Sequence, residues 1–135
     1  MTAGSLIKGI AHVGIRVWDL TRSRAFYERM GFEFIAGPIG PEPVAIMTHP
    51  SGVVVNFILN AAASSSRNVL MDVPEKHPGY THFAFAVTDV LAMKSALEQA
   101  GIALSGGPVD FESGSRSLFV RDPDRNVIEF TQELE

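Results

Sequence analysis

The chain has 135 residues, the size of one ordinary domain. Hydrophobic residues make up 46% of it and charged residues 19%, which excludes a disordered or collagen-like chain. Eleven Lys and Arg residues against fifteen Asp and Glu residues give a net charge of −4, which argues against a nucleic-acid partner. With no cysteine, disulfides, thiol nucleophiles and thiolate metal ligands are excluded.

The first residues, MTAGSLIKG, lack the pattern of a signal peptide. No apolar run approaches the ~20 residues that a membrane span needs. We therefore expect a cytoplasmic protein that does not associate with a membrane.

Residues 10–17 alternate in polarity and predict a strand. Val13 and Ile15 lie on one face, and His12 and Arg16 lie on the other. Because the apolar face must cover a helix, we expect His12 to point toward whatever the sheet encloses.

A helix is expected next, with Asp19 as its N-cap and Gly31 closing it in a left-handed conformation. Three short strand-like runs follow, F-E-F-I-A, A-I-M-T and V-V-V-N-F-I-L, separated by G-P-I-G-P-E-P and H-P-S-G. The predicted order of this unit is β-α-β-β-β.

The second half repeats the order. The run H-F-A-F-A-V predicts a strand, and a helix is expected from Asp89 to about Ala100, with Leu91 and Leu97 facing inward and Gly101 closing it. Strands are expected near I-A-L, R-S-L-F-V and N-V-I-E-F-T.

The chain is therefore interpreted as an internal duplication. Four landmarks recur in the same order in both halves: His12 and His82, Asp19 and Asp89, Gly31 and Gly101, and Asn56 and Glu129. The first three pairs are 70 positions apart (82 − 12), and one short insertion explains the longer spacing of the fourth. Residues 1–135 are then one domain, with a first module at about 8–60, a linker at 61–79 and a second module at about 80–133.

Three side chains that can carry charge are expected on the inward strand faces: His12, His82 and Glu129. A carboxylate alone in an apolar cavity would lose its charge, whereas a divalent cation offsets that cost. Two imidazoles and one carboxylate form the ligand set of a facial triad with open positions. A single His or Glu in a strand is more often packed or solvated, but matched positions in two copies favour a metal site.

Four segments carry a resemblance to a known family: H-V-G-I-R-V-x-D-L, F-Y-E-R-M-G-F, Y-T-H-F-A-F-A-V and R-D-P-D-R-N-V-I-E-F. From about Lys8 to Glu133 the chain resembles the vicinal oxygen chelate superfamily, which includes glyoxalase I, extradiol dioxygenases, fosfomycin-resistance proteins, methylmalonyl-CoA epimerase and bleomycin-resistance proteins. The resemblance implies an α+β fold in which two βαβββ modules form a curved mixed-sheet cup, with the helices on the outside.

The resemblance also places His12, His82 and Glu129 at metal-ligand positions for a divalent ion, which could be Ni, Co, Zn, Mn or Fe. The fourth ligand position, a Glu or Gln in the glyoxalase and epimerase branches, is Asn56 here. An amide oxygen is a weak ligand and cannot take a proton, so we group Asn56 with the substrate-binding residues.

Arg16 and Asn60 align with positions that hold the glutathione carboxylate in glyoxalase I, which favours an anionic substrate. The alternative is that Arg16 solvates a strand end and Asn60 caps a turn. Ring-cleaving dioxygenases have a His and a Tyr where this chain has Arg67 and Phe119. Fosfomycin-inactivating enzymes share the three ligands but also have that Tyr.

The sequence therefore favours a metal-dependent, glyoxalase-like enzyme of lyase or isomerase type. It would act on a small anionic substrate whose two oxygens coordinate the cation, with Glu129 as the catalytic proton carrier. The alternatives are a bleomycin-resistance-type protein that binds a small molecule without catalysis, or an extradiol-dioxygenase-like oxygenase. The resemblance further implies a homodimer in which His12 of one subunit often faces the other two ligands across the interface; the sequence leaves open whether the site is shared or lies within one chain.

Overall fold

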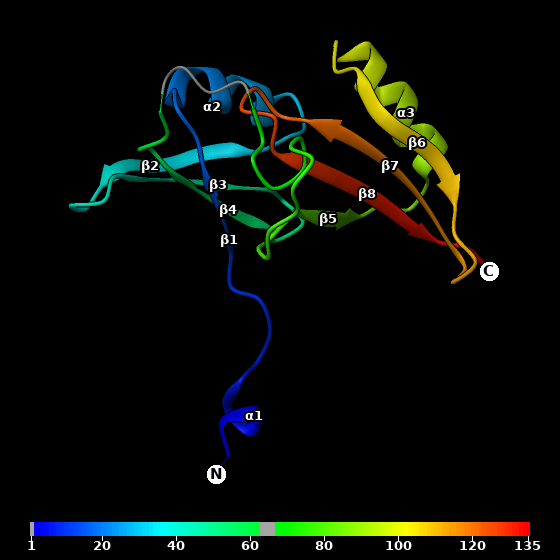
Figure 1. The fold of residues 1–135 in the computed structure, drawn as a ribbon, viewed down its shortest axis with the longest axis horizontal. Helices are drawn as coiled ribbons and strands as arrows, with labels where there is room; N and C mark the ends of the chain where they lie inside the picture. The colour runs from blue at the N-terminus through cyan, green and yellow to red at the C-terminus, as the bar shows by residue number, and fades with distance from the viewer. Residues whose placement is uncertain (1, 63–66) are drawn as a thin grey trace.

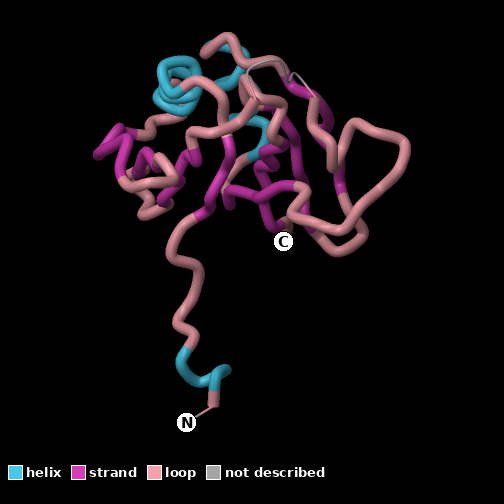
Figure 2. The backbone as a smooth tube through the Cα atoms, turned by 60° about the vertical axis from the view of Figure 1, so that its left-hand side comes forward, coloured by secondary structure: helices cyan, strands magenta, loops and turns pink. Residues whose placement is uncertain are grey.

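A computed structural model describes residues 2–62 and 67–135, and it contains the expected unit twice. The first module consists of β1 (Val13–Arg16), α2 (Leu20–Glu28), β2 (Glu33–Ile39), β3 (Val44–Thr48) and β4 (Val54–Ile58). The second consists of β5 (His82–Ala86), α3 (Val90–Gln99), β6 (Leu104–Asp110), β7 (Ser115–Arg121) and β8 (Val127–Glu133). A short helix, α1 (Ala3–Leu6), ends an arm that projects from the body (Figures 1 and 2).

Each module forms its own four-stranded mixed sheet (Figure 1). The strand orders are β1-β4-β3-β2 and β5-β8-β7-β6, with the first strand of each module parallel to its last. The predicted α+β class and βαβββ modules are therefore confirmed. Across the described residues no strand of one sheet pairs with a strand of the other, so the two sheets do not close into one continuous cup.

The first strand is shorter than the expected range 10–17. Strand β1 begins at Val13, which lies opposite Val55, and His12 is an exposed residue just before the strand. Since β4 begins at Val54, it offers residues upstream of His12 no partner with which the pairing could continue.

Both helices begin where the sequence indicates. Asp19 accepts a hydrogen bond from the Thr21 amide and Asp89 accepts one from the Ala92 amide. The expected inward position of Leu91 is wrong, because this side chain is 52% exposed.

The inward face of α3 is set by its first residue. Val90 is fully buried, and its amide donates to Oε1 of Gln132 in β8. Met93 and Leu97 follow on the same face at helical spacing, which leaves the position after Val90 pointing to solvent.

One hydrophobic core spans both modules. Tyr27 of α2 is fully buried, and its ring packs edge-on against Phe57 at 5.1 Å between centroids and Phe32 at 5.8 Å. Phe32 in turn packs against Phe85 of β5 at 5.7 Å. The helix of the first module is thus anchored against a strand of the second.

A buried carboxylate reinforces this contact between the modules. Asp122, only 3% exposed, accepts hydrogen bonds from the Tyr27 hydroxyl and the Asn126 side-chain amide, both at 2.9 Å. Burial raises the pKa of Asp122, and the hydrogen bonds that it accepts act in the opposite direction. Burial and the neighbouring carboxylate also raise the pKa of Tyr27 well above its usual value.

Residues 68–80, which we name the strap, precede β5 and are held against the second module by hydrogen bonds. Both oxygens of Asp72 accept hydrogen bonds from Arg121, at 2.8 and 2.9 Å, and one also accepts from Arg125 at 3.2 Å. The Arg121 hydrogen bonds, followed by that of Arg125, hold the pKa of Asp72 well below its usual range. Four residues of the predicted linker, 63–66, lie outside the described part of the chain.

Among residues 2–62 and 67–135, no helix combines the length and the apolar character needed to cross a membrane.

We predict that Tyr27→Phe lowers the free energy of unfolding by about 1–3 kcal/mol, because it removes a donor from a buried carboxylate. Urea denaturation followed by circular dichroism measures this change. Tyr80→Phe is the matched control: Tyr80 is 98% exposed, so its variant should stay within about 0.5 kcal/mol of the parent. Equal stability of the two variants would refute the role of the Tyr27 hydroxyl.

We also predict that the stability difference between the parent and Asp72→Asn depends on pH. The native pKa of Asp72 is lowered, so its contribution is fully present above the ordinary value of 3.8 and is lost as the pH falls below it. Urea midpoints should therefore differ more at pH 7 than at pH 3. In Glu98→Gln, which removes an exposed carboxylate 3.8 Å from Lys94, the midpoint should barely change at pH 7.

Candidate metal and substrate site

His82 and Glu129 meet on one face of the second sheet. Strand β5 runs parallel to β8 with His82 opposite Val127, so Glu129 lies two residues further along on the same face. The distance from His82 Nε2 to Glu129 Oε1 is 3.0 Å. The side chains are 39% and 15% exposed, so both remain accessible to a ligand.

A hydroxyl group lies against the outer side of each of these residues. Thr81 Oγ1 is 2.8 Å from His82 Nδ1, and Ser117 Oγ donates to Glu129 Oε2 at 2.7 Å. A threonine hydroxyl can donate or accept, so Thr81 can support His82 with the imidazole proton on either nitrogen. The inner atoms, Nε2 and Oε1, are therefore held facing one another.

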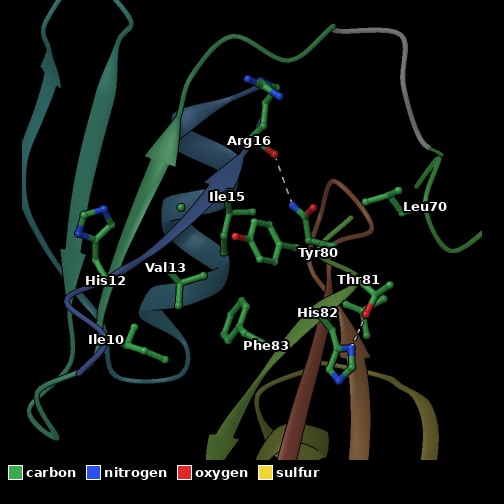
Figure 3. Close-up of a pocket in the computed structure, with 13 residues that line it drawn as sticks. Ile10, His12, Val13, Ile15, Arg16, Leu70, Tyr80, Thr81, His82 and Phe83 are labelled. Carbon is green, nitrogen blue, oxygen red and sulfur yellow. Dashed lines mark hydrogen bonds between the residues drawn. The ribbon is translucent and has the colours of Figure 1, made fainter. Parts of the chain in front are cut away.

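A cavity of about 700 Å³ is lined in part by His82 and Thr81. It lies between β1 and β5, which are edge strands of the two sheets (Figure 3). Its walls are mostly apolar and include Ile15, Leu70, Tyr80 and Phe83, of which Leu70 and Tyr80 belong to the strap. The cavity thus offers an apolar lining with the His82 imidazole and the Thr81 hydroxyl at its border.

His12 also borders the cavity but does not join the other two predicted ligands. Figure 3 shows its ring turned away from His82. Among the described residues, no three or more His, Cys, Asp or Glu side chains come together closely enough to hold a metal ion. One chain therefore brings together two of the three predicted ligands, His82 and Glu129.

Asn56 lies on β4 of the first sheet, opposite Gly14 of β1. Its Oδ1 atom is buried, and no described residue donates a hydrogen bond to it. A buried acceptor without a partner is costly, so this oxygen is suited to a donor or a cation supplied from outside the chain.

The donor atoms are of the types that bind a divalent cation, but one chain brings together only two of the three predicted ligands. An imidazole nitrogen and a carboxylate oxygen converge, and an amide oxygen elsewhere is unpaired. Such nitrogen and oxygen ligands suit Mn, Fe, Co, Ni or Zn. A single chain does not assemble the complete predicted set.

Arg16 and Asn60 are neighbours at the other end of β1 and β4. Arg16 Nε donates to Asn60 Oδ1 at 2.8 Å, and Arg16 Nη2 lies 3.9 Å from Glu42 Oε1. The contact with Glu42 is between two exposed side chains and is weak. Arg16 is also among the residues that line the cavity, and its side chain is 61% exposed.

Phe119 stands where the resemblance to the family implies a tyrosine in ring-cleaving and fosfomycin-inactivating enzymes. Its ring centroid is 6.3 Å from that of His82. A phenylalanine ring has no hydroxyl, so this position supplies packing next to the site and no acid or base.

Sequence reasoning missed Ser117, Thr81 and the strap residues Leu70 and Tyr80. Ser117 could have been found by alternation, since it lies opposite Thr131, two residues from Glu129 on the same face. Thr81 adjoins a predicted ligand. No sequence pattern indicated the position of the strap. That position depends on the ion pairs of Asp72 with Arg121 and Arg125, which lie about 50 residues further along the chain.

The fold is shared by several solved structures. A glyoxalase/dioxygenase from Nostoc punctiforme aligns with a TM-score of 0.75 and 20% identity, covering 100% of this chain and 97% of that one. A glyoxalase family protein from Enterococcus faecalis aligns with a TM-score of 0.74 and 23% identity, covering 92% and 97%.

A mutant of the fosfomycin resistance protein FosX from Listeria monocytogenes, complexed with Mn(II) and 1S,2S-dihydroxypropylphosphonic acid, aligns with a TM-score of 0.65 and 17% identity, covering 93% and 90%. At these identities the likeness establishes the fold. No curated protein sequence matches the chain significantly.

A family model matches residues 9–130, nearly the whole chain, and it includes both modules and the His82–Glu129 pair. The chain therefore belongs to the Glyoxalase/Bleomycin resistance protein/Dioxygenase superfamily.

Proposed function

We propose that the protein is a metal-dependent enzyme of glyoxalase type, catalysing a lyase or isomerase reaction on a small anionic substrate. The observation that carries this proposal is the 3.0 Å approach of Nε2 of His82, which lines the cavity, to Glu129 Oε1. The membership of a superfamily that includes metal-dependent enzymes supports it.

When bound, a divalent cation supplies a Lewis acid that stabilises negative charge on two adjacent substrate oxygens. His82 would hold it through Nε2 and Glu129 through Oε1. The unpaired Oδ1 of Asn56 is a further candidate donor. The fold relative FosX, complexed with Mn(II) and a phosphonic acid, is compatible with such a site.

The residues of the chain would carry out the other steps. Glu129, held only loosely as a ligand, would accept a proton from a substrate carbon and return it to the neighbouring carbon, which changes the position of the proton and leaves the oxidation state of the whole molecule unchanged. Arg16 binds the substrate anion through its Nη atoms, oriented by Asn60. Leu70 and Phe83 cover the apolar body of the substrate and limit the access of water.

A second chain would complete the site, with His12 of one subunit facing His82 and Glu129 of the other. Three features support this arrangement. His12 is exposed and does not reach the pair within its own chain. The edges of β1 and β5 are unpaired. Ile10 and Tyr80, beside the cavity, are 89% and 98% exposed, an apolar surface that a dimer would cover.

A small-molecule binding protein of the bleomycin-resistance type is the second candidate. It is favoured by the mostly apolar cavity and by the lack of a three-ligand cluster within the described part of one chain. Metal analysis after chelator treatment and reconstitution separates the two functions. Near-stoichiometric metal supports the enzyme, and its absence supports the binding protein.

We predict that Glu129→Gln keeps the fold but lowers metal affinity and, with a substrate found by screening, lowers turnover by about 10²- to 10⁴-fold, because an amide neither ligates strongly nor carries a proton. Calorimetric titration with Mn²⁺ measures the affinity. Glu133→Gln is the control, since Glu133 lies on the same strand at its exposed end. A Glu129→Gln protein as active as the parent would end this role.

We predict that mixing His12→Ala and Glu129→Gln chains restores metal binding. If each site is shared between two chains, a mixed dimer has one site with both defects and one intact site. Mixed dimers isolated with two different tags should therefore bind metal, whereas neither parent variant binds it well. If mixed dimers form and remain as defective as their parents, the site lies within one chain.

A further inference from the structure

Ser117 is a fully buried polar residue whose position the proposed function has not used. It lies in β7 opposite Thr131 of β8, and its side chain is on the same face as Glu129. Its hydroxyl oxygen is 2.7 Å from Glu129 Oε2 and 2.9 Å from Thr131 Oγ1. A hydroxyl buried in a β-sheet core must find hydrogen-bond partners, and both of these partners belong to the site side of the sheet.

Ser117 is the donor in both contacts. A serine hydroxyl has one proton, and an ionised carboxylate can only accept. Oε2 of Glu129 and Oγ1 of Thr131 therefore compete for the same proton. The carboxylate oxygen is the charged acceptor and lies nearer, at 2.7 Å against 2.9 Å, so the Ser117 proton is directed to Glu129.

The first module shows what the same backbone does without these hydroxyls. At the positions equivalent to Ser117 and Thr131, 73 residues earlier, stand Val44 and Ile58, which also lie opposite one another. The position equivalent to Glu129 is Asn56, and its buried Oδ1 has no donor among the described residues. The hydroxyl pair therefore accompanies the acidic residue and is not a general requirement of the fold.

We propose that Ser117 is a positioning residue that makes Glu129 a one-oxygen ligand: it occupies Oε2 and leaves Oε1 as the atom presented to the cation. This inference rests on the proposed function. Oε1 is the atom that faces His82 Nε2, so the carboxylate plane is fixed with its free oxygen toward the second ligand. Holding Glu129 in this way keeps coordination positions available for substrate oxygens.

The expected effect of removing the hydroxyl follows from the geometry. Without Ser117, the carboxylate can rotate and offer both oxygens to the cation, and its outward oxygen loses its buried donor. Loss of a group that orients a metal ligand typically lowers metal affinity about 10- to 100-fold.

The test uses the full-length protein titrated with Co²⁺, followed by calorimetry and by the visible spectrum of the bound ion. We expect Ser117→Ala to lower Co²⁺ affinity about 10- to 100-fold and to change the visible bands, because the spectrum reports the number and geometry of the ligands. Ser117→Thr, which keeps the hydroxyl, should restore both. Ser115→Ala is the matched control, two residues away on the same face of β7 and without a contact to Glu129.

Circular dichroism confirms that each variant is folded. If Ser117→Ala does not fold, Ser117→Cys replaces the hydroxyl with a weaker S–H donor of similar shape, and it should produce the same spectral change with a smaller loss of affinity. If the parent binds Co²⁺ and the affinity and spectrum of the variant are unchanged, the role of Ser117 is overturned and the proposed function stands. If the parent itself does not bind Co²⁺, both are overturned.

Discussion

The parallel pairing of the first and last strands within each module is the constraint on which the site depends. The pairing of β5 with β8 brings His82 and Glu129, 47 positions apart in sequence, within 3.0 Å of one another. Antiparallel neighbours can be joined by a tight turn, whereas parallel neighbours need a long connection, here a helix and two further strands. The two strands complete the same sheet and the helix α3 packs against it, so the same chain path builds both the scaffold and the polar face.

The two modules share a backbone plan but differ in chemistry. In the second module an acidic residue is surrounded by His82, Ser117 and Thr131, and in the first module the equivalent position is Asn56 among apolar neighbours. Duplication provides two equivalent faces, and substitution on each face then determines its charge. In this chain the paired imidazole and carboxylate lie in the second module, and the equivalent position of the first holds the neutral amide of Asn56.

Much of the fold follows from local sequence patterns. Strand alternation and the Asp caps predicted the order of elements, the class and the shared face of His82 and Glu129, because these features depend on neighbours in sequence. The end of β1 and the exposure of Leu91 were not predicted, since they depend on where β4 begins and on how Val90 packs. The sequence also does not reveal where His12 lies relative to the other ligands, because the edges of β1 and β5 have no mutual pairing that would fix their distance.

The contact of Tyr27 with Asp122 has a consequence for how the duplicated chain unfolds. Each partner belongs to a different module, and opening the second module first would leave the buried Tyr27 hydroxyl without its acceptor. The shared aromatic packing of Phe32 with Phe85 adds to the same coupling. Despite its internal repetition, we therefore expect the molecule to unfold as a single cooperative unit.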